Sequence, residues 1–145
     1  MKLLKIARVP PIIVAPEDSI MSAVEKMSDA RVGAVAVIRN GDLVGIFTER
    51  DLMLRVVRPG VSTLNTPVSK VMTKNPSVAQ LEMEASEAFE FMTEKNIRHL
   101  PIVDKQGKLQ AMLSIRHLMR QIVEGMSHEL EALNAYLGAD GIGGD

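Results

Sequence analysis

The chain has 145 residues and is 46% hydrophobic, which is enough for one compact domain or two intertwined half-domains and argues against disorder. Its net charge of −1 excludes a long-range field that would attract nucleic acid or an anionic membrane. Its aromatic content of 3% does not suggest an aromatic box for stacking a cofactor. The sequence has no cysteine, no secretory signal and no apolar run of about 20 residues, so it predicts a cytoplasmic protein without disulfides, thiolate zinc sites or a membrane span.

The first half of the chain predicts an extended segment, a helix and two strands, in that order. Asp18 or Ser19 is placed to cap the start of the helix. Residues 35–38 and 43–47 are apolar and flank Asn40-Gly41, which is typical of two strands joined by a tight hairpin. One face of the helix carries apolar residues at helical spacing, namely Ile20, Ala23, Val24 and Met27.

The second half repeats this pattern. Pro11 matches Pro76 at an offset of 65 residues, and Gly41 matches Gly107 at an offset of 66. The repeated features are the helix face at Ala85, Ala88, Phe89 and Met92, the strands at 100–103 and 109–113, and a closing helix at 49–57 and again at 115–123. Because each unit exposes apolar faces that only the other covers, the sequence predicts an α+β fold of two repeats, each with a small sheet and two helices.

These elements divide the chain into five predicted regions. Repeat 1 covers residues 1–57, a turn-rich linker 58–70, repeat 2 71–123, a C-terminal helix 124–138 and a flexible, glycine-rich tail 139–145. We expect Gly138 to end the C-terminal helix. The apolar stripe of this helix is a candidate either for a dimer contact or for packing back onto its own chain. It consists of Met126, Leu130, Leu133 and Leu137.

The most specific string is Gly-Ile-Phe-Thr-Glu-Arg-Asp at residues 45–51, where a strand ends and a helix begins. With the repeat and with Arg-His-Leu-Pro-Ile-Val at 98–103, it resembles the CBS-domain family, whose paired units form a Bateman module. The resemblance covers about residues 6–57 and 71–123. It implies two CBS repeats related by a pseudo-two-fold axis, and a homodimer that pairs through helical faces.

Thr48 and Asp51 allow two roles, which can coexist. Their spacing fits a capping box, in which the threonine caps the helix and the acid returns to the backbone of the cap, at about 1 kcal/mol. The resemblance implies that Asp51 accepts hydrogen bonds from a ribose and that Thr48 bonds a sugar hydroxyl or a phosphate. Gly45, as a glycine inside a strand, lets a ligand approach the backbone closely.

The family resemblance also implies that the cleft of Asp51 is shared with the other repeat. Its further lining would be Arg98, His99 and Pro101, with Ser77 and Val78 at the base, and Arg50 and Arg116 within reach of phosphates. In the opposite cleft, His117 replaces the acid, and Gly33 and Ala34 offer no cation. We therefore expect that second cleft to be weak or empty.

The leading hypothesis is a regulatory module that binds an adenine nucleotide (AMP, ADP or ATP), whose adenine packs against Ile12, Val78 and Pro101. The alternatives are a dimeric scaffold that binds a protein partner but no ligand, and a module that binds S-adenosylmethionine. The sequence holds no nucleophile elbow, phosphate-loop lysine or zinc-ligand cluster, so we expect no enzyme and no catalytic cofactor. His117 and His128 are 11 residues apart, and we assign them no metal.

Overall fold

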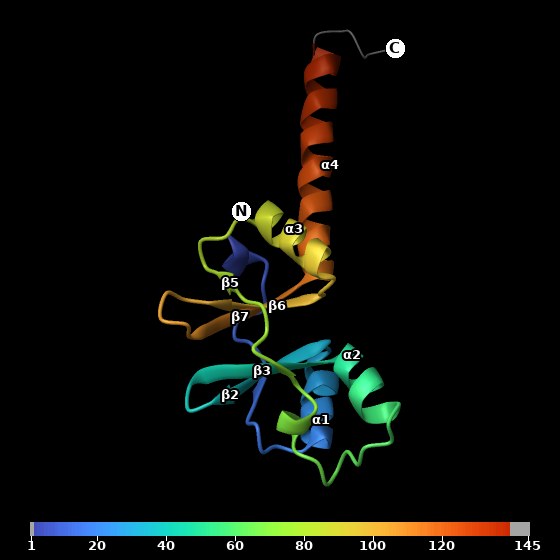
Figure 1. Ribbon diagram of the computed structural model, residues 1–145. Helices are drawn as coiled ribbons and strands as arrows, with labels where there is room; N and C mark the ends of the chain where they lie inside the picture. Colours follow the sequence, from blue (N-terminus) through green and yellow to red (C-terminus); the bar gives the residue numbers. More distant parts are fainter. Residues whose placement is uncertain (1, 140–145) are drawn as a thin grey trace.

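The computed structural model describes residues 2–139, which form two small α+β units stacked on one another with a long helix projecting from one end (Figure 1). The first unit is built on a four-stranded sheet in the order β1-β2-β3-β4. Its elements are β1 (Ile13–Val14), α1 (Ile20–Ala30), β2 (Ala34–Arg39), β3 (Asp42–Thr48), α2 (Glu49–Asp51), the π-helical turn η2 (Leu52–Val57), the 3₁₀ turn η3 (Val68–Lys70) and β4 (Thr73–Lys74).

Local signals in the sequence account for the first unit. The Ser19 hydroxyl accepts a hydrogen bond from the backbone N–H of Ser22 at 3.0 Å and so caps α1, as predicted. Asn40 and Gly41 both have positive φ and form the predicted two-residue turn between β2 and β3. The paired strands bury Val35, Val37 and other apolar side chains in the core of this unit.

The second unit repeats the arrangement with a three-stranded sheet in the order β5-β6-β7. Its elements are β5 (Ala79–Gln80), α3 (Ala85–Lys95), β6 (His99–Val103), β7 (Leu109–Ser114) and α4 (Ile115–Ala139), preceded at the N-terminus by the 3₁₀ turn η1 (Leu3–Lys5). The same backbone hydrogen bond closes both units: Gly33 O accepts from Glu49 N at 3.0 Å, and Arg98 O accepts from Ile115 N at 2.9 Å. The repeat seen in the sequence is therefore a repeat in structure.

The segment at the start of each repeat crosses over to the other unit. Leu3 and Ile6 are buried in the core of the second unit, where the backbone of Arg8 pairs with β7. In return, β4 pairs with β3, and Val68 is fully buried in the first core. The predicted linker 58–70 thus contributes a core residue, and each unit is completed by chain that lies next to the other repeat in the sequence.

The helix α4 runs without a break from Ile115 to Ala139, so the structure joins the two helices predicted at 115–123 and 124–138. Gly125 and Gly138 both lie inside it, because a helix tolerates glycine at a cost of about 1 kcal/mol. Residues 140–145 of the predicted tail lie outside the described residues. Within residues 2–139, no helix combines the length and the apolarity that a membrane span requires.

Candidate functional site

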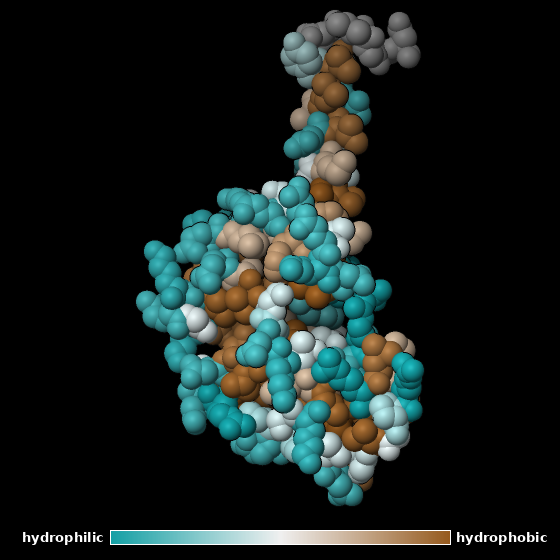
Figure 2. All heavy atoms as spheres, viewed as in Figure 1, coloured by the Kyte–Doolittle hydropathy of each residue, from teal (hydrophilic) through white to brown (hydrophobic). Residues whose placement is uncertain are grey.

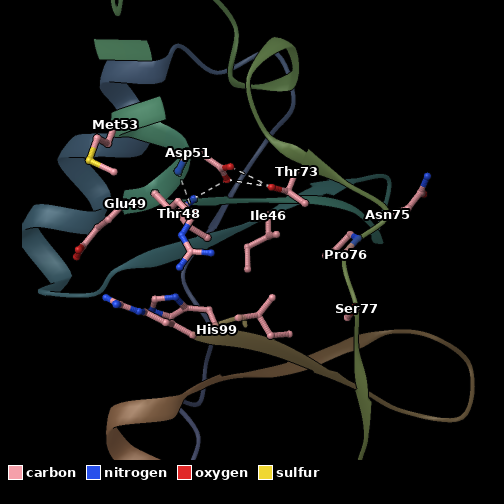
Figure 3. Close-up of a pocket in the computed structure, with 13 residues that line it drawn as sticks. Ile46, Thr48, Glu49, Asp51, Met53, Thr73, Asn75, Pro76, Ser77 and His99 are labelled. Carbon is pink, nitrogen blue, oxygen red and sulfur yellow. Dashed lines mark hydrogen bonds between the residues drawn. The ribbon is translucent and has the colours of Figure 1, made fainter. Parts of the chain in front are cut away.

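A cavity of about 620 Å³ lies where the two units meet, beside the junction of β3 and α2 (Figure 3). Its volume is within the range of small-molecule sites. In the close-up, Thr48, Asp51 and Ile46 lie on one side, and His99 and Ser77 lie on the other. The lining residues are Ile46, Thr48, Glu49, Arg50, Asp51, Met53, Thr73, Asn75, Pro76, Ser77, Ile97, Arg98 and His99.

The structure brings six of the nine predicted site residues together in this cavity: Thr48, Arg50, Asp51, Ser77, Arg98 and His99. The other three are not among its described lining residues. Pro101 is buried within β6, and Val78 is half-buried just before β5. Arg116 is the second residue of α4 and lines the opposite cleft instead.

Asp51 is fixed on the cavity wall by a hydrogen-bond network. Its Oδ2 accepts from the backbone N–H of Thr48, and the Thr48 hydroxyl accepts from the N–H of Asp51, both at 3.1 Å, which is the predicted capping box. The carboxylate also accepts from the Thr73 hydroxyl, at 3.0 Å to Oδ1 and 3.2 Å to Oδ2 (Figure 3). Arg55 Nε lies 3.7 Å from Oδ1. A ligand hydroxyl that reached Asp51 would share or replace the bond from Thr73.

Thr73 is a site residue that the sequence analysis missed, and the one that contacts Asp51. It belongs to β4, whose pairing with β3 is a contact between distant parts of the chain that no local pattern predicts. The sequence does carry one signal: Thr73 lies 65 residues after Arg8, so it is the counterpart of a residue in the other crossing segment. Arg8 pairs with Met112 of β7 as Thr73 pairs with Ile46 of β3.

Gly45 serves this crossing segment rather than a ligand, which corrects the sequence-based interpretation. A Cβ atom at Gly45 would overlap the sulfur of Met72 and lie 3.0 Å from the backbone oxygen of Thr73. Gly45 also pairs with Lys74 in the sheet. The missing side chain is therefore needed for β4 to approach β3.

Charged groups of both signs border the cavity. Arg50 and Arg98 are exposed, and Arg50 Nη1 donates to the backbone oxygen of Asn96 at 3.1 Å, which ties α2 to the second unit. Glu49 and His99 approach each other across Gly33, where an added Cβ would lie 3.0 Å from Glu49 Oε1 and from His99 Nε2. The arrangement offers two cations to an anionic group near the rim.

Burial lowers the pKa of His99, and Arg98 adds to this effect, while Glu49 opposes it. The imidazole is therefore neutral near pH 7. In that form one ring nitrogen donates a hydrogen bond and the other accepts one. His99 thus supplies a polar contact at neutral pH, and a full positive charge only in more acidic solution.

The opposite cleft has a volume of about 950 Å³. The sequence analysis predicted that it offers no cation, and this prediction is wrong. Gly33 and Ala34 do line it, and His117 does stand where the first cleft has its acid. However, Arg8 and Arg116 also line this cleft. Arg8 was missed because it arrives on the crossing N-terminal segment. The expected weakness of this cleft therefore depends on the replacement of the Asp51 carboxylate by His117 and not on a lack of positive charge, although Glu49 also lines this cleft.

The family model of the CBS domain matches this chain twice, at residues 5–58 and 68–124. The CBS domain-containing protein CBSCBSPB3 of Arabidopsis thaliana is 38% identical over 118 residues, which are 79% of this chain and 21% of that protein. The mitochondrial protein CBSX3 of the same plant is 33% identical over 126 residues, which are 83% of this chain and 61% of that protein. The chain thus spans less than two thirds of the length of these relatives.

Solved structures of CBS-domain pairs share the fold. A putative signal-transduction protein from Burkholderia ambifaria MC40-6 has 30% identity and a TM-score of 0.75, with 81% of this chain and 85% of that chain covered. CBSX2, solved in complex with AMP, has 24% identity and a TM-score of 0.70, with coverage of 85% and 96%. A CBS-domain pair solved with 5′-methylthioadenosine and S-adenosyl-L-methionine has 21% identity and a TM-score of 0.77, with 86% of this chain and 98% of that chain covered. These likenesses confirm the predicted α+β fold of tandem repeats.

Proposed function

Because the chain belongs to the CBS-domain family, we propose that it is a regulatory module that binds an adenine nucleotide in the cavity of Asp51. The observation that carries the proposal is the arrangement of charge around this cavity. A buried carboxylate, Asp51, lies on the wall, and two exposed cations, Arg50 and Arg98, border the same space. A nucleotide has hydroxyls that suit the acid and phosphates that suit the cations.

In this proposal, each part of the nucleotide would meet a different part of the cavity lining. The ribose hydroxyls would donate to Asp51, in exchange for part of its bonding to Thr73. The phosphates would meet Arg50 and Arg98, whose guanidinium groups bind phosphate oxygens in pairs. The adenine would pack against apolar wall residues, which are Ile46, Met53, Pro76 and Ile97. This differs from the predicted adenine contacts, since Ile12 lines the opposite cleft.

Two solved proteins with this fold support the ligand class, since one is in complex with AMP and the other with 5′-methylthioadenosine and S-adenosyl-L-methionine. S-Adenosylmethionine remains the alternative small ligand. It carries a positively charged sulfonium and no phosphate. Its one carboxylate would pair with a single arginine, and its sulfonium and ammonium groups make the molecule positive overall, so the two cations of the cavity favour a nucleotide.

One observation favours the scaffold alternative. The Asp51 carboxylate already accepts hydrogen bonds from Thr48 and Thr73, so the acid has a complete structural role without a ligand. In a scaffold, the module would act only through a protein partner or a homodimer. The partner, the homodimer and the absence of catalysis stay predictions. A cytoplasmic location also stays a prediction, because one relative is named as a mitochondrial protein.

Titration calorimetry with the full chain separates these functions. We expect AMP, ADP or ATP to bind more tightly than adenosine and S-adenosylmethionine. Arg98→Ala should weaken the best nucleotide by about tenfold, or about 1.4 kcal/mol, and leave adenosine unchanged, because only the phosphate contact is lost. Arg39→Ala is the matched control, since Arg39 is exposed at the end of β2 and lines neither cleft. Absence of binding at millimolar concentration would favour the scaffold.

A further inference from the structure

The helix α4 carries a continuous apolar stripe from Met119 to Leu137 that the described part of the chain leaves largely exposed. Figure 1 shows this helix extending well beyond α3, and Figure 2 shows apolar side chains along its projecting part. The stripe extends for about 27 Å along the helix axis, from Met119 to Leu137. Its residues Met119, Val123, Met126, Leu130 and Leu133 are between 49% and 59% exposed, and Leu137 is half-buried.

The spacing of the stripe is regular. Successive members are four, three, four, three and four residues apart, so they alternate between the a and d positions of a heptad: Val123, Leu130 and Leu137 at a, and Met119, Met126 and Leu133 at d. A surface helix that packs on its own domain has a broader apolar face with a period of 3.6, whereas a strict a/d stripe is the seam of a coiled coil.

The stripe is separate from the face that packs on the body of the molecule. Leu118 is fully buried in the core of the second unit, and Ile115 and Ile122 pack against that core. These three residues occupy the c and g positions of the same heptads, about a quarter turn away from the a/d stripe. The helix therefore remains anchored by one face and presents the other.

The projecting part also needs support that its own residues do not provide. A helix that projects into water without packing is only marginally stable, because helix nucleation is costly and most helical stability in proteins comes from packing. Gly125, Asn134 and Gly138 lie in the upper turns, and each is a weaker helix former than alanine. A partner along the stripe would supply the missing packing.

We propose that α4 pairs in parallel with α4 of a second copy of this chain, as a two-stranded coiled coil through the a/d stripe. An a/d helix is covered best by another a/d helix, whose knobs fill its holes, and every further copy presents one with the same length and register. The a/d stripe would then be a contact surface of the predicted homodimer, and this pairing does not depend on nucleotide binding.

Charge sets the parallel orientation. In an antiparallel coiled coil, g positions of one helix lie opposite g positions of the other. In the antiparallel register that pairs all six stripe residues, Glu129 at g would therefore face Glu129 of the second copy. In the parallel arrangement, Glu129 at g faces the neutral Asn134 at e of the second copy. The parallel pair thus avoids two adjacent carboxylates at the centre of the seam.

The cysteine-free sequence makes disulfide cross-linking a direct test. In the parallel pair, a Leu133→Cys side chain meets its own counterpart at a distance that suits a disulfide. Under mild oxidation we expect a covalent dimer from Leu133→Cys and none from the control Ala135→Cys, because Ala135 occupies the opposite face at f. If Leu133→Cys cross-links only when mixed with Val123→Cys, the pair is antiparallel and the proposed orientation fails.

Light scattering of the full chain gives a second readout. The wild type should be a dimer at micromolar concentration, and Leu130→Glu should shift its dissociation constant upward by at least tenfold, whereas Ala135→Glu should not. A monomeric wild type, or a Leu130→Glu variant that remains as dimeric as the wild type, would overturn the proposal. Calorimetry with AMP on Leu130→Glu keeps the two proposals apart, since nucleotide binding in the body is expected to be unchanged.

Discussion

Asp51 is held by more contacts than a capping box supplies. Besides the backbone N–H of Thr48, the carboxylate accepts from the Thr73 hydroxyl and faces Arg55. A capping interaction alone contributes about 1 kcal/mol. The additional bonds join the start of α2 to the segment that arrives from the other repeat, so this acid stabilises the wall of the site as well as the helix.

Removing the carboxylate should therefore cost more than a cap. We expect Asp51→Ala to lower the free energy of unfolding by about 2–4 kcal/mol, because the N–H of Thr48 and the hydroxyl of Thr73 both lose their acceptor in a partly buried place. Asp51→Asn should cost less, since its amide oxygen still accepts one bond. Urea unfolding measures both variants, with Ser19→Ala as a control that removes only the cap of α1, at about 1 kcal/mol. A loss of only about 1 kcal/mol for Asp51→Ala would mean that the Thr73 bond contributes little.

His99 makes the proposed binding dependent on pH. Its pKa is lowered by burial, so the free protein holds a neutral imidazole near pH 7. The same lowered pKa gives stability that is present above about pH 6.5 and is lost as the pH falls further, because the unfolded chain takes up the proton more readily. A bound phosphate beside His99 favours the charged form. Nucleotide binding should then take up a proton.

Calorimetry in two buffers of different ionisation enthalpy measures this uptake. Between pH 8 and pH 6, the wild type should gain affinity for AMP relative to His99→Gln, in which no imidazole can be protonated. The comparison with the variant is needed because the phosphate itself titrates near pH 6. His128→Gln, in the projecting part of α4, is the matched control. Equal proton uptake by the wild type and His99→Gln would place the phosphate away from His99.

At the scale of elements, the pairing of β4 with β3 depends on Gly45. We expect Gly45→Ala to lower the free energy of unfolding by about 1–3 kcal/mol, because the new methyl group would overlap Met72 and press on the backbone of Thr73. Gly125→Ala is a control of opposite sign. No atom lies within 4 Å of an added Cβ at Gly125, so alanine should raise stability by up to about 1 kcal/mol through helix propensity. Thermal unfolding of both variants tests the pair.

The elements that the sequence predicts are those with local signals. The turn at Asn40-Gly41 and the cap at Ser19 are each specified within a few residues, and both are found. The short strands β4 and β1 have two residues each, too few to show a period of two. The break expected in α4 was inferred from the end of the repeat, whereas the helix continues beyond it.

The candidate site follows the same division. Thr48 and Asp51 were predicted from one motif at a strand-to-helix junction, and Arg98 and His99 from the shared cleft that the family resemblance implies. Thr73 was missed because its place in the site results from a long-range strand pairing. Arg116 was assigned to the wrong side of the join for a related reason: the sequence shows which residues begin a helix but not which of two facing clefts they enter.

At the scale of the whole molecule, the crossing segments make the two repeats one structural unit. The N-terminal turn that holds Leu3 lies at the start of the first repeat yet fills the core of the second unit, and Val68 lies at the start of the second repeat yet fills the core of the first unit. Neither core is complete within its own stretch of sequence. We therefore expect both units to unfold in a single transition, and damage at one end of the chain to spread to the other unit.

Leu3→Ala tests this coupling. Leu3 is fully buried, so its truncation should lower the free energy of unfolding by about 2–5 kcal/mol. Hydrogen exchange should show the loss of protection in β6 and β7, although the substitution lies at the start of the chain. Leu4→Ala is the neighbouring control, with a side chain that is 43% exposed and an expected effect within about 0.5 kcal/mol. If protection falls only in the first unit, the crossing segment does not stabilise the second core.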